Sequence, residues 1–177
     1  MSLIVKELET KLPGKTGFIF ISGGETKNDS SANVERYDPN LSFWTPVHPM
    51  REARSNHVFI RCGDYLYSIG GKATGLSMDG QITCLNSVER YNVNANKWDQ
   101  VAPMNKERFD FAAVVLHDEI YVIGGKVLLD YNHVTKARAT PRTEKYDPAT
   151  NTWLELPKMN HARSSPSVVT VNSTCTY

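Results

Sequence analysis

The chain has 177 residues, 40% of them hydrophobic and 22% charged, and its 20 basic side chains nearly balance its 19 acidic ones. This is the composition of a globular domain large enough to have its own core. The formal net charge of +1 gives no electrostatic reason to expect nucleic acid or an anionic membrane as a partner, and no apolar run approaches the roughly 20 residues that would span a bilayer.

The first sixteen residues precede any repeated pattern. A charge at Lys6 comes too early for a secretory signal peptide, and residues 7–12 could form little more than one helical turn before Pro13. We interpret residues 1–16 as a linker and expect a cytoplasmic protein. The cysteines are odd in number and irregularly spaced, which predicts reduced thiols, with no disulfide framework, no metal site and no cofactor; they are Cys62, Cys84 and Cys175.

From Gly17 onward, one pattern occurs three times. Each tryptophan lies seven residues after a tyrosine, six before a methionine and ten before an arginine; the tryptophans are Trp44, Trp98 and Trp153. A glycine pair precedes each tyrosine, at 23–24, 70–71 and 124–125. Only the interval from this pair to the tyrosine varies, being 13, 20 and 21 residues. A fixed frame with one elastic segment predicts a set of strands joined by one loop of variable length, where binding residues tend to lie.

Within each unit, the pattern predicts four short strands in chain order. The innermost is an apolar run such as Val58–Ile60, and the second runs into the glycine pair, as Tyr65–Ile69 does. The third alternates apolar and polar residues, as in Val88–Tyr91, and the tryptophan opens the fourth. No segment has the periodicity of a long amphipathic helix.

The recurring residues are expected to form the frame of the repeat. The glycine pair should lie where backbones crowd and no Cβ fits. The tyrosine and tryptophan should fill the space between units, with the hydroxyl and the indole N–H finding partners; an aromatic cage for a sugar or methyl-lysine is the alternative. A glutamate two residues before each tyrosine should pair with a basic residue or with loop backbone; these are Glu35, Glu89 and Glu144.

Four segments carry a resemblance to a known family: residues 87–91 (Ser-Val-Glu-Arg-Tyr), Trp98, residues 101–104 (Val-Ala-Pro-Met) and residues 120–125 (Ile-Tyr-Val-Ile-Gly-Gly). They resemble the kelch repeat, in the form it takes in animal kelch-like proteins. Over residues 17–171 this implies an all-β kelch β-propeller segment of about three four-stranded antiparallel blades. Its repeats would span 17–54, 55–108 and 109–163, followed by the first strand of a next blade at 164–171.

The resemblance also implies a function. Kelch-like proteins carry BTB and BACK domains before the propeller, which recruits a protein or peptide substrate to cullin-3 ubiquitin ligases, so the chain would be a non-catalytic protein-interaction module. An actin-binding kelch scaffold is one alternative. A kelch-type sugar epimerase is another, because the sequence does not show which Arg, His and Glu meet in a central channel. Sequence signatures of a metal site, a nucleophilic serine or a phosphate loop are missing.

The strand count makes the ring incomplete. The units offer three, four and four strands, and residues 165–171 offer one more, which amounts to three blades offset by one strand; kelch rings have five to seven blades. Either the chain is a piece of a larger propeller, or two chains associate, each one's last strand completing the other's first blade. The second explanation follows from the apolar faces and unpaired strand edges that an open half-ring exposes.

Family resemblance places partner contacts on two sets of loops. The loop after the glycine pair carries Glu25, Lys72 and Lys126, and the loop before the innermost strand carries Arg54-Ser55-Asn56, Arg108-Phe109-Asp110 and Arg163-Ser164-Ser165. Arginine suits bidentate recognition of carboxylates, but its fixed spacing suits a frame residue equally well. Asp110 argues against a strongly acidic ligand.

Overall fold

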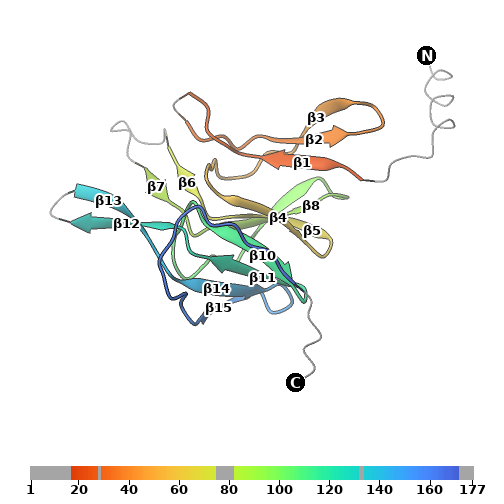
Figure 1. The fold of residues 1–177 in the computed structure, drawn as a ribbon. Helices are drawn as coiled ribbons and strands as arrows, with labels where there is room; N and C mark the ends of the chain where they lie inside the picture. Colours follow the sequence, from red (N-terminus) through yellow and green to blue (C-terminus); the bar gives the residue numbers. More distant parts are fainter. Residues whose placement is uncertain (1–16, 28, 75–81, 132–133, 172–177) are drawn as a thin grey trace, which may run out of the picture.

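The computed structural model describes residues 17–27, 29–74, 82–131 and 134–171. The predicted linker and Cys175 lie outside the described residues. Within them, all regular secondary structure is β-strand. Three main antiparallel sheets stand beside one another, each forming one blade (Figure 1). The predicted all-β architecture of four-stranded antiparallel blades is confirmed.

The three blades differ in their number of strands. Blade 1 has three, which are β1 (Ile19–Ser22), β2 (Val34–Asp38) and β3 (Phe43–Val47). Blade 2 has four, which are β4 (Val58–Cys62), β5 (Tyr65–Ile69), β8 (Val88–Asn92) and β9 (Lys97–Val101). Blade 3 has four, which are β10 (Ala112–Leu116), β11 (Glu119–Ile123), β14 (Thr143–Asp147) and β15 (Thr152–Leu156). Blade 1 therefore lacks, within the described residues, the innermost strand that β4 and β10 supply to the other two.

Two further ladders occupy the segments 72–86 and 126–141, which we expected to be loops. They are the pairs β6 (Lys72–Ala73) with β7 (Thr83–Cys84) and β12 (Lys126–Tyr131) with β13 (Val134–Ala139). Both ladders begin at the residue that directly follows a glycine pair, Lys72 in one and Lys126 in the other. The backbone leaving that pair is already extended, so the two sides of the variable segment can pair with each other.

Residues 164–171 do not form the strand that we predicted for them. Their start is fixed, because Gly125 N donates to Arg163 O (3.0 Å) and Ser165 N donates to Asp110 O (2.6 Å). The segment then runs along β10, as the blue trace in Figure 1 shows. A strand needs a ladder partner, and nothing in the described part of the chain pairs with this segment.

The core lies between the blades. The cluster between blades 1 and 2 contains Val34, Met50, Tyr91 and Trp98. The larger cluster between blades 2 and 3 contains Cys62, Tyr67, Ile69, Val88, Val101, Met104, Phe111, Ile120, Val122 and Tyr146. The predicted role of the recurring aromatic residues as packing between units is confirmed in blades 2 and 3, whereas Trp44 of blade 1 is 45% exposed.

Both aromatic positions also find the predicted polar partners. The indole Nε1 of Trp98 donates to His48 O of blade 1 (2.8 Å), and that of Trp153 donates to Ala102 O of blade 2 (2.8 Å). The hydroxyl of Tyr91 donates to Asn96 Oδ1 (2.7 Å). Trp98 and Trp153 thus each join their own blade to the connection that leaves the preceding blade.

The glycine pairs of blades 2 and 3 lie where neighbouring backbones meet, as predicted, whereas a Cβ on Gly24 of the first pair would meet nothing within 4 Å. Gly70 and Gly71 have φ values of 55° and 98°. A Cβ on Gly70 would lie 2.8 Å from Arg108 O, and one on Gly71 would lie 2.6 Å from Ser55 O. Neither the conformation nor the space allows a side chain.

Candidate partner-binding face

The two sets of loops predicted to bind a partner meet at one end of the blades. Lys72 and Ser55 exchange two backbone hydrogen bonds of 2.8 Å. Lys126 and Phe109 do the same at 3.1 and 2.7 Å. Each glycine-pair loop is therefore held directly against the loop that precedes an innermost strand, and together they form one continuous surface.

The accessible side chains of this surface are linked to one another. Lys72 Nζ forms an ion pair with Glu25 Oε2 (3.3 Å). Asp110 accepts a hydrogen bond from Asn56 Nδ2 (2.6 Å) through one carboxylate oxygen and forms an ion pair with Lys126 Nζ (2.8 Å) through the other. We call these five residues the binding face. Its two lysines are each matched by a carboxylate, so the face carries both charges without a net excess.

Backbone geometry places these groups at a regular interval. Asn56, Asp110 and Ser165 occupy the same position in successive repeats and have positive φ values of 53°, 52° and 49°. Asp110 N donates to Asn56 O (3.0 Å), and Ser165 N donates to Asp110 O (2.6 Å). Asn and Asp tolerate this left-handed conformation better than most residues. The hydrogen-bonded series presents one polar side chain from each repeat.

In the first two repeats, the recurring arginine is a buried residue of the frame and not an accessible contact for a partner. None of the Arg54 side chain is exposed. Its Nη1 donates to Gly70 O (2.8 Å) and Ser87 O (3.1 Å), and its Nη2 forms an ion pair with Glu89 Oε1 (2.9 Å). Arg108 is equally buried and repeats this arrangement with Gly124 O (3.0 Å), Arg142 O (3.1 Å) and Glu144 (2.5 Å).

Glu89 and Glu144 also bind loop backbone. We call each Arg–Glu pair, with the backbone groups that it holds, a clamp. Glu89 also accepts hydrogen bonds from the backbone N–H groups of Arg51 (2.8 Å) and Glu52 (3.2 Å). Glu144 accepts one from Asn105 N (2.9 Å). For Glu89 and Glu144, both predicted partners, a basic side chain and loop backbone, are confirmed; Glu35 is exposed and makes neither contact within the described residues. Each Arg–Glu pair fixes the connection from one blade to the frame of the next.

Of the twelve residues predicted to contact a partner, four have little or no accessible surface. Arg54 and Arg108 belong to the clamp, and Ser55 and Phe109 are buried beneath the loops. Eight are accessible or partly so: Glu25, Asn56, Lys72, Asp110, Lys126, Arg163, Ser164 and Ser165. Arg163 is exposed, and no hydrogen bond or ion pair of its guanidinium is formed within the described residues.

One contributor to this surface was not predicted. Ser30 Oγ lies within hydrogen-bonding distance of Ser55 Oγ (3.2 Å), Lys72 O (3.2 Å) and Thr74 Oγ1 (3.1 Å). It joins the loop of blade 1 to that of blade 2. Ser30 has no counterpart at a constant spacing, because it lies in the elastic interval of the repeat.

Other chemistry is limited in the part of the chain that the structure describes. No group of three or more His, Cys, Asp or Glu side chains there is placed to hold a metal ion. Cys62 and Cys84 are free thiols, and burial raises the pKa of Cys84 to about 12. The described residues also contain no helix long and apolar enough to cross a membrane.

Comparison with known proteins identifies the repeat. The family model of the Kelch motif matches residues 53–105 and 107–160. The chain is 28% identical to Kelch-like protein 26 of Danio rerio over 84% of its length, 27% identical to Kelch-like protein 15 of Gallus gallus over 88%, and 36% identical to human Kelch-like protein 28 over 69%. It spans only 23%, 33% and 21% of these relatives, respectively.

Proposed function

Because this chain belongs to the kelch-repeat family, we propose that it is a non-catalytic protein-interaction module whose binding face holds a protein or peptide. In its most specific form, the proposal makes the chain the substrate-recruiting part of a cytoplasmic cullin-3 ubiquitin-ligase adaptor. The similarity to kelch-like proteins supports this form. The cullin contact itself would be made by other domains of the full-length protein.

The observation that carries the proposal is the way the face is built. The accessible side chains of Lys72 and Lys126 are held by rigid backbone. The N–H and the C=O of each lysine are both hydrogen-bonded to a buried residue, Ser55 and Phe109 respectively. Binding groups held on rigid elements lose little conformational entropy on binding. A surface built in this way is typical of loops that carry recognition on a fixed scaffold.

The charges of the face indicate what kind of segment it would bind. Both lysines are already paired with carboxylates, so a strongly acidic peptide would have to displace Glu25 or Asp110. A polar segment of mixed charge can instead exchange one of these ion pairs for its own without leaving a charge unmatched. We therefore expect the ligand to be a mixed polar peptide, with its hydrogen bonds directed at Asn56 and the two ion pairs.

Affinity capture with variants tests the proposal. A protein retained by the chain should be lost, or bound at least about tenfold more weakly, in Lys126→Ala and Asn56→Ala, because each removes one side of the network at Asp110. Asp64→Ala is the matched control: Asp64 is an exposed loop residue between β4 and β5, at the opposite end of blade 2.

Two results would contradict the proposal. A partner that binds all three variants equally would place recognition elsewhere on the blades. Failure of the full-length protein to retain cullin-3 would remove the adaptor role while leaving the binding face intact. Sedimentation of the chain with actin filaments would favour the cytoskeletal alternative over the adaptor.

A further inference from the structure

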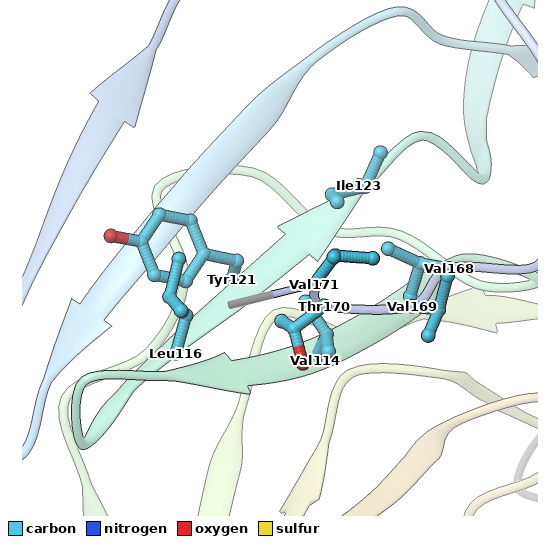
Figure 2. A pocket seen from close by; sticks show the side chains of 8 residues that line it. All are labelled: Val114, Leu116, Tyr121, Ile123, Val168, Val169, Thr170 and Val171. Atoms are coloured by element: carbon cyan, nitrogen blue, oxygen red, sulfur yellow. The ribbon is translucent and has the colours of Figure 1, made fainter. Parts of the chain in front are cut away.

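In blade 3, one carboxylate is held between a cation and a hydroxyl at the end of the blade away from the binding face. Glu119 is the first residue of β11; its Oε1 accepts a hydrogen bond from Lys145 Nζ (2.6 Å), and its Oε2 accepts one from the Tyr121 hydroxyl (2.9 Å). Tyr121 and Lys145 are paired across β11 and β14, so their side chains leave the sheet on the same side. Figure 2 shows the Tyr121 hydroxyl directed away from Ile123, which lies beside the glycine pair. Lys145, and to a lesser extent Tyr121, lowers the pKa of the Glu119 carboxyl by these hydrogen bonds.

Blade 2 repeats the cation and the hydroxyl. Tyr67 occupies the position of Tyr121, three residues before the glycine pair, and Arg90 occupies the position of Lys145, one residue before the recurring tyrosine. The two are paired in the same way across β5 and β8. Burial raises the pKa of Tyr67, and Arg90 acts against this rise, as a cation close to the hydroxyl does. The two groups that hold the carboxylate in blade 3 are thus together in blade 2 as well.

The carboxylate itself is not repeated, because Tyr65 stands where blade 3 has Glu119. The guanidinium of Arg90 lies over the Tyr65 ring, 4.6 Å from its centroid. An arginine stacked in this way keeps the donors in its own plane available to a carboxylate. Asp99 lies opposite Arg90 across β8 and β9, but its carboxylate is paired with Lys97 Nζ (3.1 Å). Arg90 is therefore a half-buried cation that forms no ion pair with any carboxylate of the described residues.

Blade 1 has the cation without the hydroxyl. Arg36 lies over the ring of Phe18, 4.4 Å from its centroid, and its partner across β1 and β2 is Phe20. A phenyl ring has no hydroxyl to donate, so blade 1 offers a carboxylate only one of the two donors that Glu119 uses. Among the three blades as described, blade 2 is the one that combines both donors with no carboxylate at this position.

From this comparison, we propose that Arg90 and Tyr67 bind the carboxylate of a glutamate or aspartate side chain from another protein segment, in the way that blade 3 binds Glu119. Tyr65 holds the guanidinium from one side, and the Nη groups of Arg90 donate to one carboxylate oxygen while the Tyr67 hydroxyl donates to the other. Tyr65 and Arg90 are half-buried, whereas Tyr67 is only 1% exposed. The acidic side chain therefore enters beside Tyr65 and Arg90.

This site and the binding face lie at opposite ends of the blades. β5 begins at Tyr65 and ends at Ile69, directly before the glycine pair that leads into the binding face. The site faces blade 3, since the rings of Tyr67 and Tyr146 have centroids 5.9 Å apart, so both blades that bound it are present in the chain. The inference goes beyond the proposed function, because the two sites differ in place and in ligand and either can fail alone.

Titration of the isotope-labelled chain with N-acetyl-glutamate amide, followed by NMR through the arginine Nε–H resonances, tests the proposal. The Arg90 resonance should shift saturably at millimolar probe concentrations. N-acetyl-glutamine amide, which has nearly the same shape without the charge, should leave it unchanged. Arg36 provides a control in the same spectrum, and its apparent affinity should be lower by about tenfold or more because one donor is missing. The absence of a saturable shift, or equal shifts with both probes, would overturn the proposal.

Tyr65→Glu gives blade 2 the carboxylate that blade 3 has, so it should abolish binding of the glutamate probe. Tyr67→Phe copies the pair of blade 1 and should weaken binding about tenfold, because it removes one hydrogen bond to a charged group. Lys158→Gln removes a positive charge from an exposed position elsewhere and should bind as wild type does, as should Lys126→Ala on the binding face. Backbone amide spectra show that each variant is folded.

Two outcomes of the variant series would contradict the site. Undiminished binding of the glutamate probe by folded Tyr65→Glu or Tyr67→Phe would place the probe elsewhere on the chain. Tighter binding of N-acetyl-phosphoserine amide than of the glutamate probe would overturn the assignment to a carboxylate, which rests on one donor for each of two oxygens.

Discussion

Arg54 and Glu89 form an ion pair of 2.9 Å in which the arginine side chain has no exposed surface. The pair links the connection after blade 1 to the third strand of blade 2, and the hydrogen bonds of Arg54 to Gly70 O and Ser87 O tie the same connection to that blade. The same arrangement at Arg108 and Glu144 makes it a property of the repeat. A partner would have to open the blade to reach either arginine.

Removal of the arginine should therefore destabilise the fold. Arg54→Met leaves the Glu89 carboxylate buried with only two backbone donors, and we expect a loss of about 3–5 kcal/mol in the free energy of unfolding. Urea denaturation followed by fluorescence measures it. Lys97→Met is the control, because its ion pair with Asp99 is exposed and should contribute less than about 1 kcal/mol.

A double variant separates the charge from the packing. Arg54→Met combined with Glu89→Gln leaves no unmatched buried charge, so it should be more stable than Arg54→Met alone by about 1 kcal/mol or more. If the double variant is instead as unstable as the sum of the two single ones, the ion pair is not the source of the stability.

Comparison of Gly63 with Gly70 separates two costs of replacing a glycine by alanine, namely the left-handed backbone conformation and the lack of space for a Cβ. Gly63 and Gly70 have nearly the same φ, 56° and 55°, but a Cβ on Gly63 would meet nothing within 4 Å, whereas one on Gly70 would meet Arg108 O at 2.8 Å. Gly63→Ala should cost about 1 kcal/mol, the cost of a left-handed conformation. Gly70→Ala should cost clearly more, since backbone must also move.

Thermal or urea unfolding of the two variants measures this difference. A similar loss in both would mean that the Gly70 loop shifts freely, and that crowding does not explain why glycine recurs there.

The sequence predicted the frame well because each frame residue recurs at a constant spacing. The strand that Trp98 opens, the packing of Tyr91 and the place of the glycine pair all follow from contacts that every blade must make. The binding face was predicted only in part, because a fixed spacing does not distinguish a buried arginine from an accessible one. Burial of Arg54 depends on Glu89, which lies 35 residues further along the chain and is brought close only by the antiparallel pairing of the blade.

Features that depart from the repeat were harder to predict. The ladder of β12 and β13 lies in the variable interval, whose length differs from repeat to repeat, so no constant spacing marks its strands. The segment 164–171 has the sequence of a strand, but strand formation depends on a neighbour that local sequence does not supply. Comparison of the repeats with one another would have revealed two further departures: Ser22 stands where blade 2 has Ile69, and His57 stands where the next repeat has Phe111.

These two departures compensate each other at the boundary of blades 1 and 2. Ser22 Oγ lies 2.9 Å from His57 Nε2, so two polar groups take the place of the apolar pair Ile69 and Phe111. Burial, and to a lesser extent the charge of Arg54, lowers the pKa of His57 from 6.5 to about 4. The folded chain thus holds this imidazole neutral under conditions in which the unfolded chain would protonate it.

Stability should consequently depend on pH through His57. Between pH 6.5 and about 4 the unfolded state binds the additional proton, so the free energy of unfolding should fall as the pH falls across this window and stay constant with respect to His57 above it. At about 1.4 kcal/mol for each pKa unit, the loss is at most about 3.5 kcal/mol at the acid end. Urea denaturation of wild type and His57→Phe at pH 7.5, 6.0 and 4.5 isolates this contribution, since carboxylates titrate alike in both.

The variant S22I/H57F, which copies the Ile–Phe pair of the next interface, keeps the site packed. The stability of wild type relative to S22I/H57F should decrease toward low pH; a difference that stays constant from pH 7.5 to 4.5 would show that the buried imidazole does not govern it.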